Sequence, residues 1–149
     1  MKLEEEIKQK EFRNDYQKSV LNLFYTASWL LEKLQLFFDR FGITFKQYNV
    51  LRILRGQYPD AISTSEIRTR MVDKSSDASR IVDRLASRGL VTKKTCPGDK
   101  RLVDIGISRK GLDLLIQIDA CTEELDRITY SISTEEAREL SRILDKIRE

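Results

Sequence analysis

The chain has 149 residues, of which 40% are hydrophobic and 34% charged, with only 6 Gly and 2 Pro. This composition favours one soluble, compact, helix-rich domain over a disordered chain. The amino terminus lacks the basic-then-apolar order of a secretion signal, and its longest apolar stretch is too short to cross a bilayer. We therefore expect a cytoplasmic protein without a membrane span.

The residue counts exclude most enzyme chemistries. The chain has no histidine, which removes the commonest general base, the catalytic triads and most catalytic zinc sites. Its six glycines are scattered singly, so the sequence contains no glycine-rich phosphate loop. Cys96 and Cys121 are too few and too far apart for a disulfide framework or a zinc knuckle. We predict that the protein is not an enzyme and needs no cofactor or metal.

Positive charge is concentrated in the middle of the chain. Residues 63–110 hold 12 Lys and Arg against 6 Asp and Glu. Because the whole chain has a net charge of +3, this segment carries +6 and the two flanks together carry −3. A basic centre suits a polyanion such as nucleic acid, although solvated basic faces are also common.

Two helices are predicted before this basic segment. Apolar residues recur at helical spacing over residues 12–41, and Gly42 ends the pattern. A second helix is expected over residues 45–57, because the following Tyr58 and Pro59 are typical of a turn.

The basic segment opens with a helix-turn-helix pattern. Ser63 and Glu66 form a capping box that starts a short helix. After a tight turn, either Asp73 or Ser75 can cap a second helix over residues 75–88. A short helix, a turn and a second amphipathic helix together predict a helix-turn-helix.

The second helix of this pair has two distinct faces. The apolar face is expected to pack inward and consists of Ala78, Ile81, Val82 and Leu85. The opposite face is polar and cationic, and it presents Ser76, Ser79, Arg80, Asp83, Arg84 and Ser87 to solvent.

Two short strands follow, over residues 90–95 and 102–107. The connecting loop, residues 96–101, contains Pro and Gly and is typical of a hairpin, with cations at its tip. This hairpin is interpreted as a wing.

Two helices are predicted after the wing. The first is expected over residues 109–130, and a second capping box at Ser133 and Glu136 starts the last, over residues 133–147. The predicted fold class is mainly α with a small β-hairpin wing, arranged as a winged helix-turn-helix with helical ends.

Five short motifs support a more specific interpretation: Gln47 to Leu51, Arg80 to Leu85, Gly89 to Val91, Asp99 to Arg101, and Ser108 to Gly111. In order and spacing they resemble the MarR family of winged helix-turn-helix transcriptional regulators, over roughly the whole chain. The resemblance implies a dimeric repressor or activator whose first and last helices intertwine. It also implies DNA binding that often responds to small aromatic compounds or oxidants.

The resemblance divides the single domain, residues 1–149, into two kinds of segment. Residues 44–111 form the winged-helix DNA-binding core, and residues 1–43 and 112–149 form dimerisation helices. Two residues depart from the family pattern. Asp77 stands where members often carry a neutral or basic residue, and Cys96 lies in the wing.

The helix over residues 75–88 is interpreted as a recognition helix that enters the major groove of DNA. Arg80 can bind guanine through two hydrogen bonds, Asp77 can accept one from a cytosine amino group, and Arg84 is expected to bind a phosphate. The full set of predicted contacts is Lys74, Ser75, Ser76, Asp77, Ser79, Arg80 and Arg84. The alternative is an ordinary amphipathic surface helix.

The wing supplies a second set of predicted DNA contacts, formed by Lys94, Asp99, Lys100 and Arg101. Arg101 can enter the neighbouring minor groove, where narrow AT-rich tracts concentrate negative potential, and the resemblance implies that Asp99 orients it. The lysines add salt-sensitive attraction to phosphates. The alternative is a solvated hairpin with no DNA contact.

Two further features suggest regulation. Aromatic residues of the first two helices, Phe24, Tyr25, Trp29 and Tyr48, are candidates for an effector pocket, or else they serve core packing. Cationic neighbours favour the thiolate of Cys96, which makes this residue a candidate oxidant sensor, or else it is an inert loop thiol.

The sequence therefore predicts a sequence-specific DNA-binding transcriptional regulator. We expect a repressor that binds a palindromic operator in double-stranded DNA as a homodimer and is released by a small aromatic effector or an oxidant. The alternative is a winged-helix protein-interaction module without DNA binding.

Overall fold

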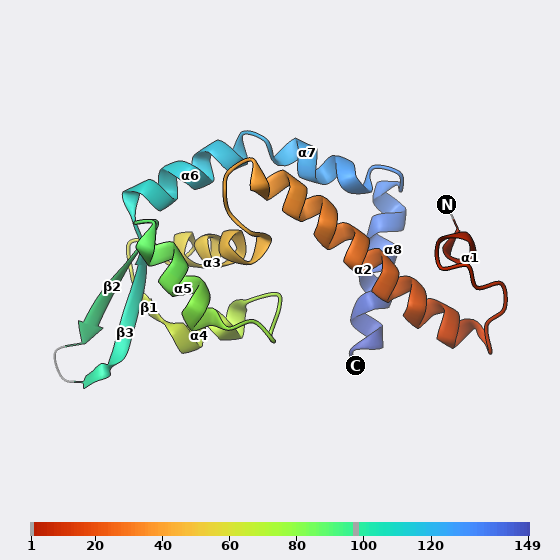
Figure 1. Ribbon diagram of the computed structural model, residues 1–149, viewed down its shortest axis with the longest axis horizontal. Helices are drawn as coiled ribbons and strands as arrows, with labels where there is room; N and C mark the ends of the chain where they lie inside the picture. Colours follow the sequence, from red (N-terminus) through yellow and green to blue (C-terminus); the bar gives the residue numbers. More distant parts are fainter. Residues whose placement is uncertain (1, 97–98) are drawn as a thin grey trace.

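A helix-turn-helix with a β-hairpin lies at one end of the molecule, and an arm of helices extends away from it (Figure 1). The computed structural model describes residues 2–96 and 99–149. In chain order the elements are α1 (Leu3–Glu6), α2 (Asp15–Asp39), α3 (Phe45–Arg55), β1 (Ile62–Ser63), α4 (Thr64–Arg70), α5 (Ala78–Ser87), β2 (Val91–Cys96), β3 (Asp99–Ile107), α6 (Arg109–Asp119), α7 (Thr122–Asp126), the 3-10 helix η1 (Arg127–Thr129) and α8 (Thr134–Ile147).

Polar side chains fix the first residues of the helices. The two predicted capping boxes are confirmed: Ser63 and Glu66 cap α4, and Ser133 and Glu136 cap α8. A third box, formed by Thr44 and Gln47, caps α3. Each box satisfies backbone N–H groups that have no partner inside the helix, so the helix begins at a defined residue.

The wing belongs to a three-stranded antiparallel sheet with strand order β1-β3-β2. Val91 of β2 pairs with Ile107 of β3, and Ile62 of β1 pairs with Ile105. The two predicted wing strands are confirmed, but β1 was not predicted because two residues carry no periodicity. The sheet ties the start of α4 to the base of the wing.

The core lies between α3, α4, α5, α6 and the sheet. Its fully buried side chains include Leu51, Leu54, Ile67, Met71, Leu85, Leu90, Ile105, Leu115 and Ile118. The end of α2 joins this core through Phe38, whose ring lies 4.4 Å from the ring of Tyr48. Arg55 of α3 forms an ion pair with Asp119 of α6 at 2.5 Å. The predicted fold class, mainly α with a small antiparallel sheet, is confirmed.

Two predicted helix boundaries are wrong. The helix expected over residues 75–88 begins at Ala78, because Asp77, and neither Asp73 nor Ser75, provides the cap. The helix expected over residues 109–130 is interrupted after Asp119, where Ala120 and Cys121 separate α6 from α7. Helical periodicity continues through this break, so the pattern alone does not reveal it.

The helical arm is unusual because it exposes most of its apolar side chains. Helix α2 has 25 residues, but only Phe37 and Phe38 are buried, and α8 buries none of its residues. The exposed apolar side chains of the two helices include Tyr16, Val20, Leu23, Phe24, Leu31, Leu36, Leu140, Ile143 and Ile147. Within the described residues, no helix combines the length and the apolar character that crossing a membrane would require.

Candidate nucleic-acid interface

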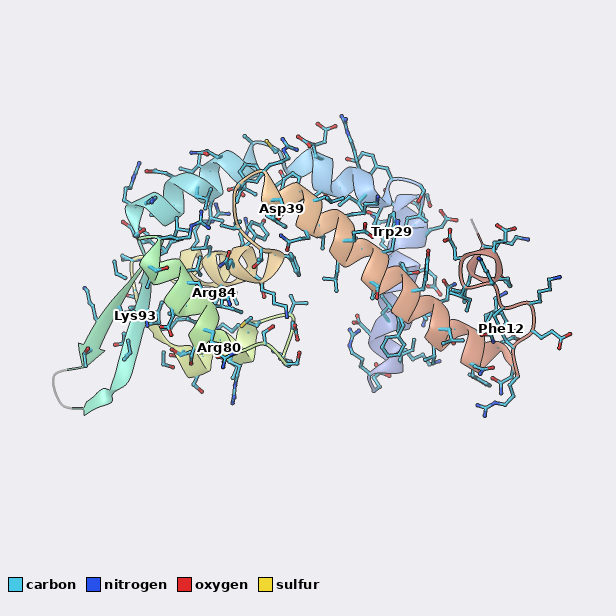
Figure 2. The ribbon with its side chains drawn as sticks, viewed as in Figure 1. Phe12, Trp29, Asp39, Arg80, Arg84 and Lys93 are labelled. Carbon is cyan, nitrogen blue, oxygen red and sulfur yellow. The ribbon has the colours of Figure 1, made fainter. Side chains whose placement is uncertain are left out.

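Helix α5 packs one face on the core and leaves the other open. Ala78, Val82 and Leu85 are buried, as the sequence predicted. Figure 2 shows Arg80 and Arg84 one turn apart on this helix, with Lys93 on the neighbouring strand β2. Both arginines are exposed, so their guanidinium groups are available to an external anion.

The first turn of α5 is organised by Asp77. Its Oδ1 accepts a hydrogen bond from the backbone N–H of Arg80 at 3.1 Å. Its Oδ2 lies 3.1 Å from Nε of the Arg80 side chain. The carboxylate predicted to read a cytosine is therefore engaged, at both oxygens, with the main chain and side chain of Arg80.

The turn between α4 and α5 is organised by Asp73. This carboxylate accepts hydrogen bonds from the Ser75 backbone N–H at 2.9 Å, the Ser75 hydroxyl at 2.6 Å and the Ser76 hydroxyl at 2.8 Å. Lys46 of α3 adds an ion pair at 2.8 Å. The Lys46 ammonium, together with the serine donors, holds the pKa of Asp73 far below its usual range. Asp73 thus joins α3 to the segment that precedes α5.

These contacts separate the predicted recognition residues into two groups. Ser79, Arg80 and Arg84 lie on the open face of α5 and are exposed, and Ser75 and Lys74 are exposed in the preceding turn. Ser76, by contrast, is only 8% exposed and is bonded to Asp73. Ser76 therefore lies within the protein, and among the seven predicted contacts of residues 74–84 it is the one that is buried.

The base of the wing is connected to α5. Lys93 of β2 forms an ion pair with Asp83 on the outer face of α5, a link that the sequence analysis missed. Lys94 is exposed on the same strand and pairs in register with Asp104 of β3. The side chains of Cys96, Asp99, Lys100 and Arg101, which the sequence predicted as wing contacts and a redox site, lie outside the described part of the structure.

The four predicted effector residues do not form one site. Tyr25 and Trp29 line a cavity of about 350 Å³ together with Leu3 and Glu6. The Tyr25 hydroxyl donates to a Glu6 oxygen at 2.6 Å, which raises the pKa of Tyr25. Phe24 is 70% exposed. Tyr48 packs against Phe38 at the edge of the core, so it takes part in core packing.

A different cavity lies where the arm meets the winged unit. Its volume is about 460 Å³, and α2, α3 and α5 all contribute to it. The lining residues are Leu31, Glu32, Gln35, Thr44, Phe45, Lys46, Gln47, Ile81 and Arg84. Two of these also take part in the contacts described above: Arg84 lies on the open face of α5, and Lys46 pairs with Asp73. The sequence missed this cavity because its residues come from three segments far apart along the chain.

Comparison with known proteins agrees with this architecture. Residues 41–102 match the model of the MarR family. The transcriptional repressor MprA of Escherichia coli is 25% identical over 135 residues, which cover 89% of this chain and 77% of that protein. A MarR transcription factor from Planctomyces limnophilus is 28% identical, with a TM-score of 0.70 over 91% of this chain and 98% of that one. A mutant MarR from Escherichia coli, crystallised with operator DNA, has a TM-score of 0.79 at 22% identity, over 93% of this chain and 99% of that one.

A helix-turn-helix flanked by a three-stranded sheet, with an exposed cationic helix face, defines the winged-helix class of transcriptional regulators. Within this class the chain resembles the MarR family, whose model matches residues 41–102 and to which the transcription factor from Planctomyces limnophilus belongs. The predicted resemblance to this family is confirmed, and the matched proteins are transcriptional regulators rather than enzymes.

Proposed function

We propose that this protein is a MarR-family regulator that binds a palindromic operator as a homodimer and represses transcription. The observation that carries the proposal is the open face of α5, where Ser79, Arg80 and Arg84 are exposed on a helix whose opposite face is fixed in the core. A rigid helix with donors on one face is the element that reads base edges in the major groove. The Escherichia coli MarR of similar fold was crystallised with operator DNA, which supports DNA binding by this chain.

The homodimer is supported by the exposed apolar surface of α2 and α8. Tyr16, Leu31, Leu140 and Ile143 are large apolar side chains that an isolated protomer leaves in water. A two-fold dimer buries the same surface twice and places two recognition helices about one DNA turn apart. We assign dimerisation to residues 1–43 and to the chain after α6. Because Leu115 and Ile118 of α6 pack in the core, the second boundary lies nearer Ala120 than residue 112.

Repression is supported by the name of a relative, the transcriptional repressor MprA. A protein-interaction module would use the exposed apolar side chains of α2 and α8, but it would not account for the face of α5, which is cationic and hydroxylic rather than apolar.

Replacing Arg80 with alanine tests the recognition helix. After an operator is selected from a random duplex pool, Arg80→Ala should weaken operator binding by roughly 5- to 150-fold, because one bidentate arginine–guanine pair contributes about 1–3 kcal/mol. Discrimination should also be lost at one position of each half-site. The measurement is fluorescence anisotropy at fixed salt.

Arg109→Ala is a matched control for this variant. The Arg109 side chain is 84% exposed and paired with Asp113, whereas the Arg80 side chain is 82% exposed and paired with Asp77, so both variants remove one similarly placed charge. Equal losses in the two variants would reduce the role of Arg80 to general electrostatic attraction and would contradict base recognition by α5.

We further propose that a small aromatic acid releases the protein from DNA by binding the cavity between α2, α3 and α5. Leu31, Phe45 and Ile81 provide apolar walls for a ring. Lys46 and Arg84 provide two cations for a carboxylate, against one acidic residue, Glu32. A bound carboxylate would compete with Asp73 for Lys46 and so loosen the turn before α5.

The effector proposal is tested with substituted benzoates and their neutral benzamides. Benzoates should dissociate the operator complex, and benzamides should not. In Lys46→Gln the benzoate concentration needed for half-release should rise about tenfold or more, because the variant loses a charged hydrogen bond to the acid. The Tyr25→Phe variant, altered in the other cavity, should respond as the unaltered protein does. Equal release by benzamides, or an unchanged response in Lys46→Gln, would rule out this site.

A further inference from the structure

We infer that Asp77 is a positioning residue that orients Arg80 and thereby sets base discrimination, rather than reading a base itself. This inference rests on the proposed DNA-binding function. Its basis is that a single carboxylate contacts both the backbone N–H and the side-chain Nε of the same arginine. The carboxylate therefore holds the backbone of Arg80 in the first turn of α5 and also restrains the direction of its guanidinium group.

The pair leaves the reading edge of Arg80 open. The ion pair involves Nε, on the inner side of the guanidinium. Among the described residues, no hydrogen bond occupies the two terminal nitrogens of Arg80, and the side chain is 82% exposed. Those two nitrogens form the fork that matches O6 and N7 of guanine.

The surroundings of Asp77 make this orientation reproducible. Asp73 fixes the two preceding serines through three hydrogen bonds and anchors them to α3 through Lys46. Ala78, directly after Asp77, is buried in the core. The backbone on both sides of Asp77 is thus restrained. The position of its carboxylate is therefore well defined, and the carboxylate can restrain the longer side chain of Arg80.

The negative charge of Asp77 has a cost that its capping role does not require, because asparagine and serine cap helices equally well. A carboxylate beside DNA phosphates weakens attraction to every duplex, operator or not. An exposed ion pair also adds little stability in water. The Asp77–Arg80 pair contributes when DNA binds, because an arginine that is already restrained loses less conformational entropy on binding guanine. Asp77 should therefore weaken binding to every duplex and at the same time sharpen discrimination between the operator and other sequences.

The test uses Asp77→Asn in the full-length protein, because asparagine caps helices as well as aspartate but carries no charge. Binding is measured by anisotropy on three duplexes: the selected operator, the operator changed at the position read by Arg80, and a random sequence. We expect tighter binding to the random duplex and about a fivefold smaller ratio between the operator and its changed form. Asp77→Ser, another good cap without charge, should behave in the same way. Circular dichroism melting verifies that both variants are folded.

A double-mutant cycle distinguishes positioning from direct reading. In an Arg80→Ala background, Asp77→Asn should no longer alter discrimination at any position. If Asp77→Asn leaves discrimination intact in the otherwise unaltered protein, Asp77 is only a helix cap and the inference is overturned. If it still alters discrimination without Arg80, Asp77 contacts a base itself and the inference is again overturned. If the unaltered protein does not distinguish the three duplexes, the proposed function itself fails.

Discussion

Replacing Leu140 and Ile143 together by glutamate should convert the protein from a dimer to a monomer at micromolar concentration. Both side chains are largely exposed on α8, a helix that buries none of its own residues in the protomer. A buried apolar side chain contributes about 1.5–3 kcal/mol, and an unpaired charge in its place adds a further cost. Because a monomer loses the gain from binding two half-sites at once, its operator affinity should fall roughly 100-fold or more.

Analytical ultracentrifugation measures the oligomeric state, and anisotropy measures operator binding. Arg138→Glu is the control, because it changes the net charge by the same amount on the opposite side of α8 and should leave the dimer intact. A variant with both glutamates that remains dimeric would show that α8 lies outside the interface. A monomer that retains full operator affinity would contradict a two-half-site mode of binding.

Replacing Gly111 with alanine should destabilise the fold by about 3 kcal/mol, a typical cost of forcing atoms into a closely packed site. A Cβ at this position would lie 2.3 Å from the Leu90 carbonyl oxygen and 2.8 Å from Ile107 Cγ1. The first of these is a backbone atom between α5 and β2, so α6 would have to move away from it. The melting temperature should fall by roughly 6–12 °C.

Gly56→Ala is the matched control for this substitution. At Gly56 the backbone φ is −65°, which alanine adopts freely, and the nearest atom to an added Cβ lies 3.4 Å away. The melting temperature should therefore change little, or rise slightly because alanine restricts the unfolded chain. Equal destabilisation in the two variants would show that the approach of α6 to Leu90 is not what requires glycine at position 111.

Local rules predicted most of the elements correctly. The capping boxes at Ser63 and Ser133 begin α4 and α8 as expected, because a cap depends only on residues three positions apart. The inward face of α5 was also correct, since helical periodicity decides which side chains point the same way. The two-residue strand β1 and the interruption at Cys121 were missed, because neither leaves a local pattern.

The candidate site was predicted less completely. The sequence identified Arg80 and Arg84 as exposed cations of a recognition helix, and the structure places both on its open face. It did not reveal that Asp77 caps this helix, that Asp73 binds Lys46 from α3, or that Lys93 binds Asp83. The Lys46 and Lys93 pairs join elements that are separate along the chain, so spacing gives no signal for them.

The sequence by itself determined the class of protein, the order of its helices and strands, and the cationic character of its central segment. These properties follow from residue type and from spacings of a few positions, which act on the chain before it folds. Only the tertiary structure decided which carboxylate engages which cation, where the cavity between arm and winged unit lies, and why Gly111 has no room for a side chain. Those features depend on distances between segments that only packing brings together.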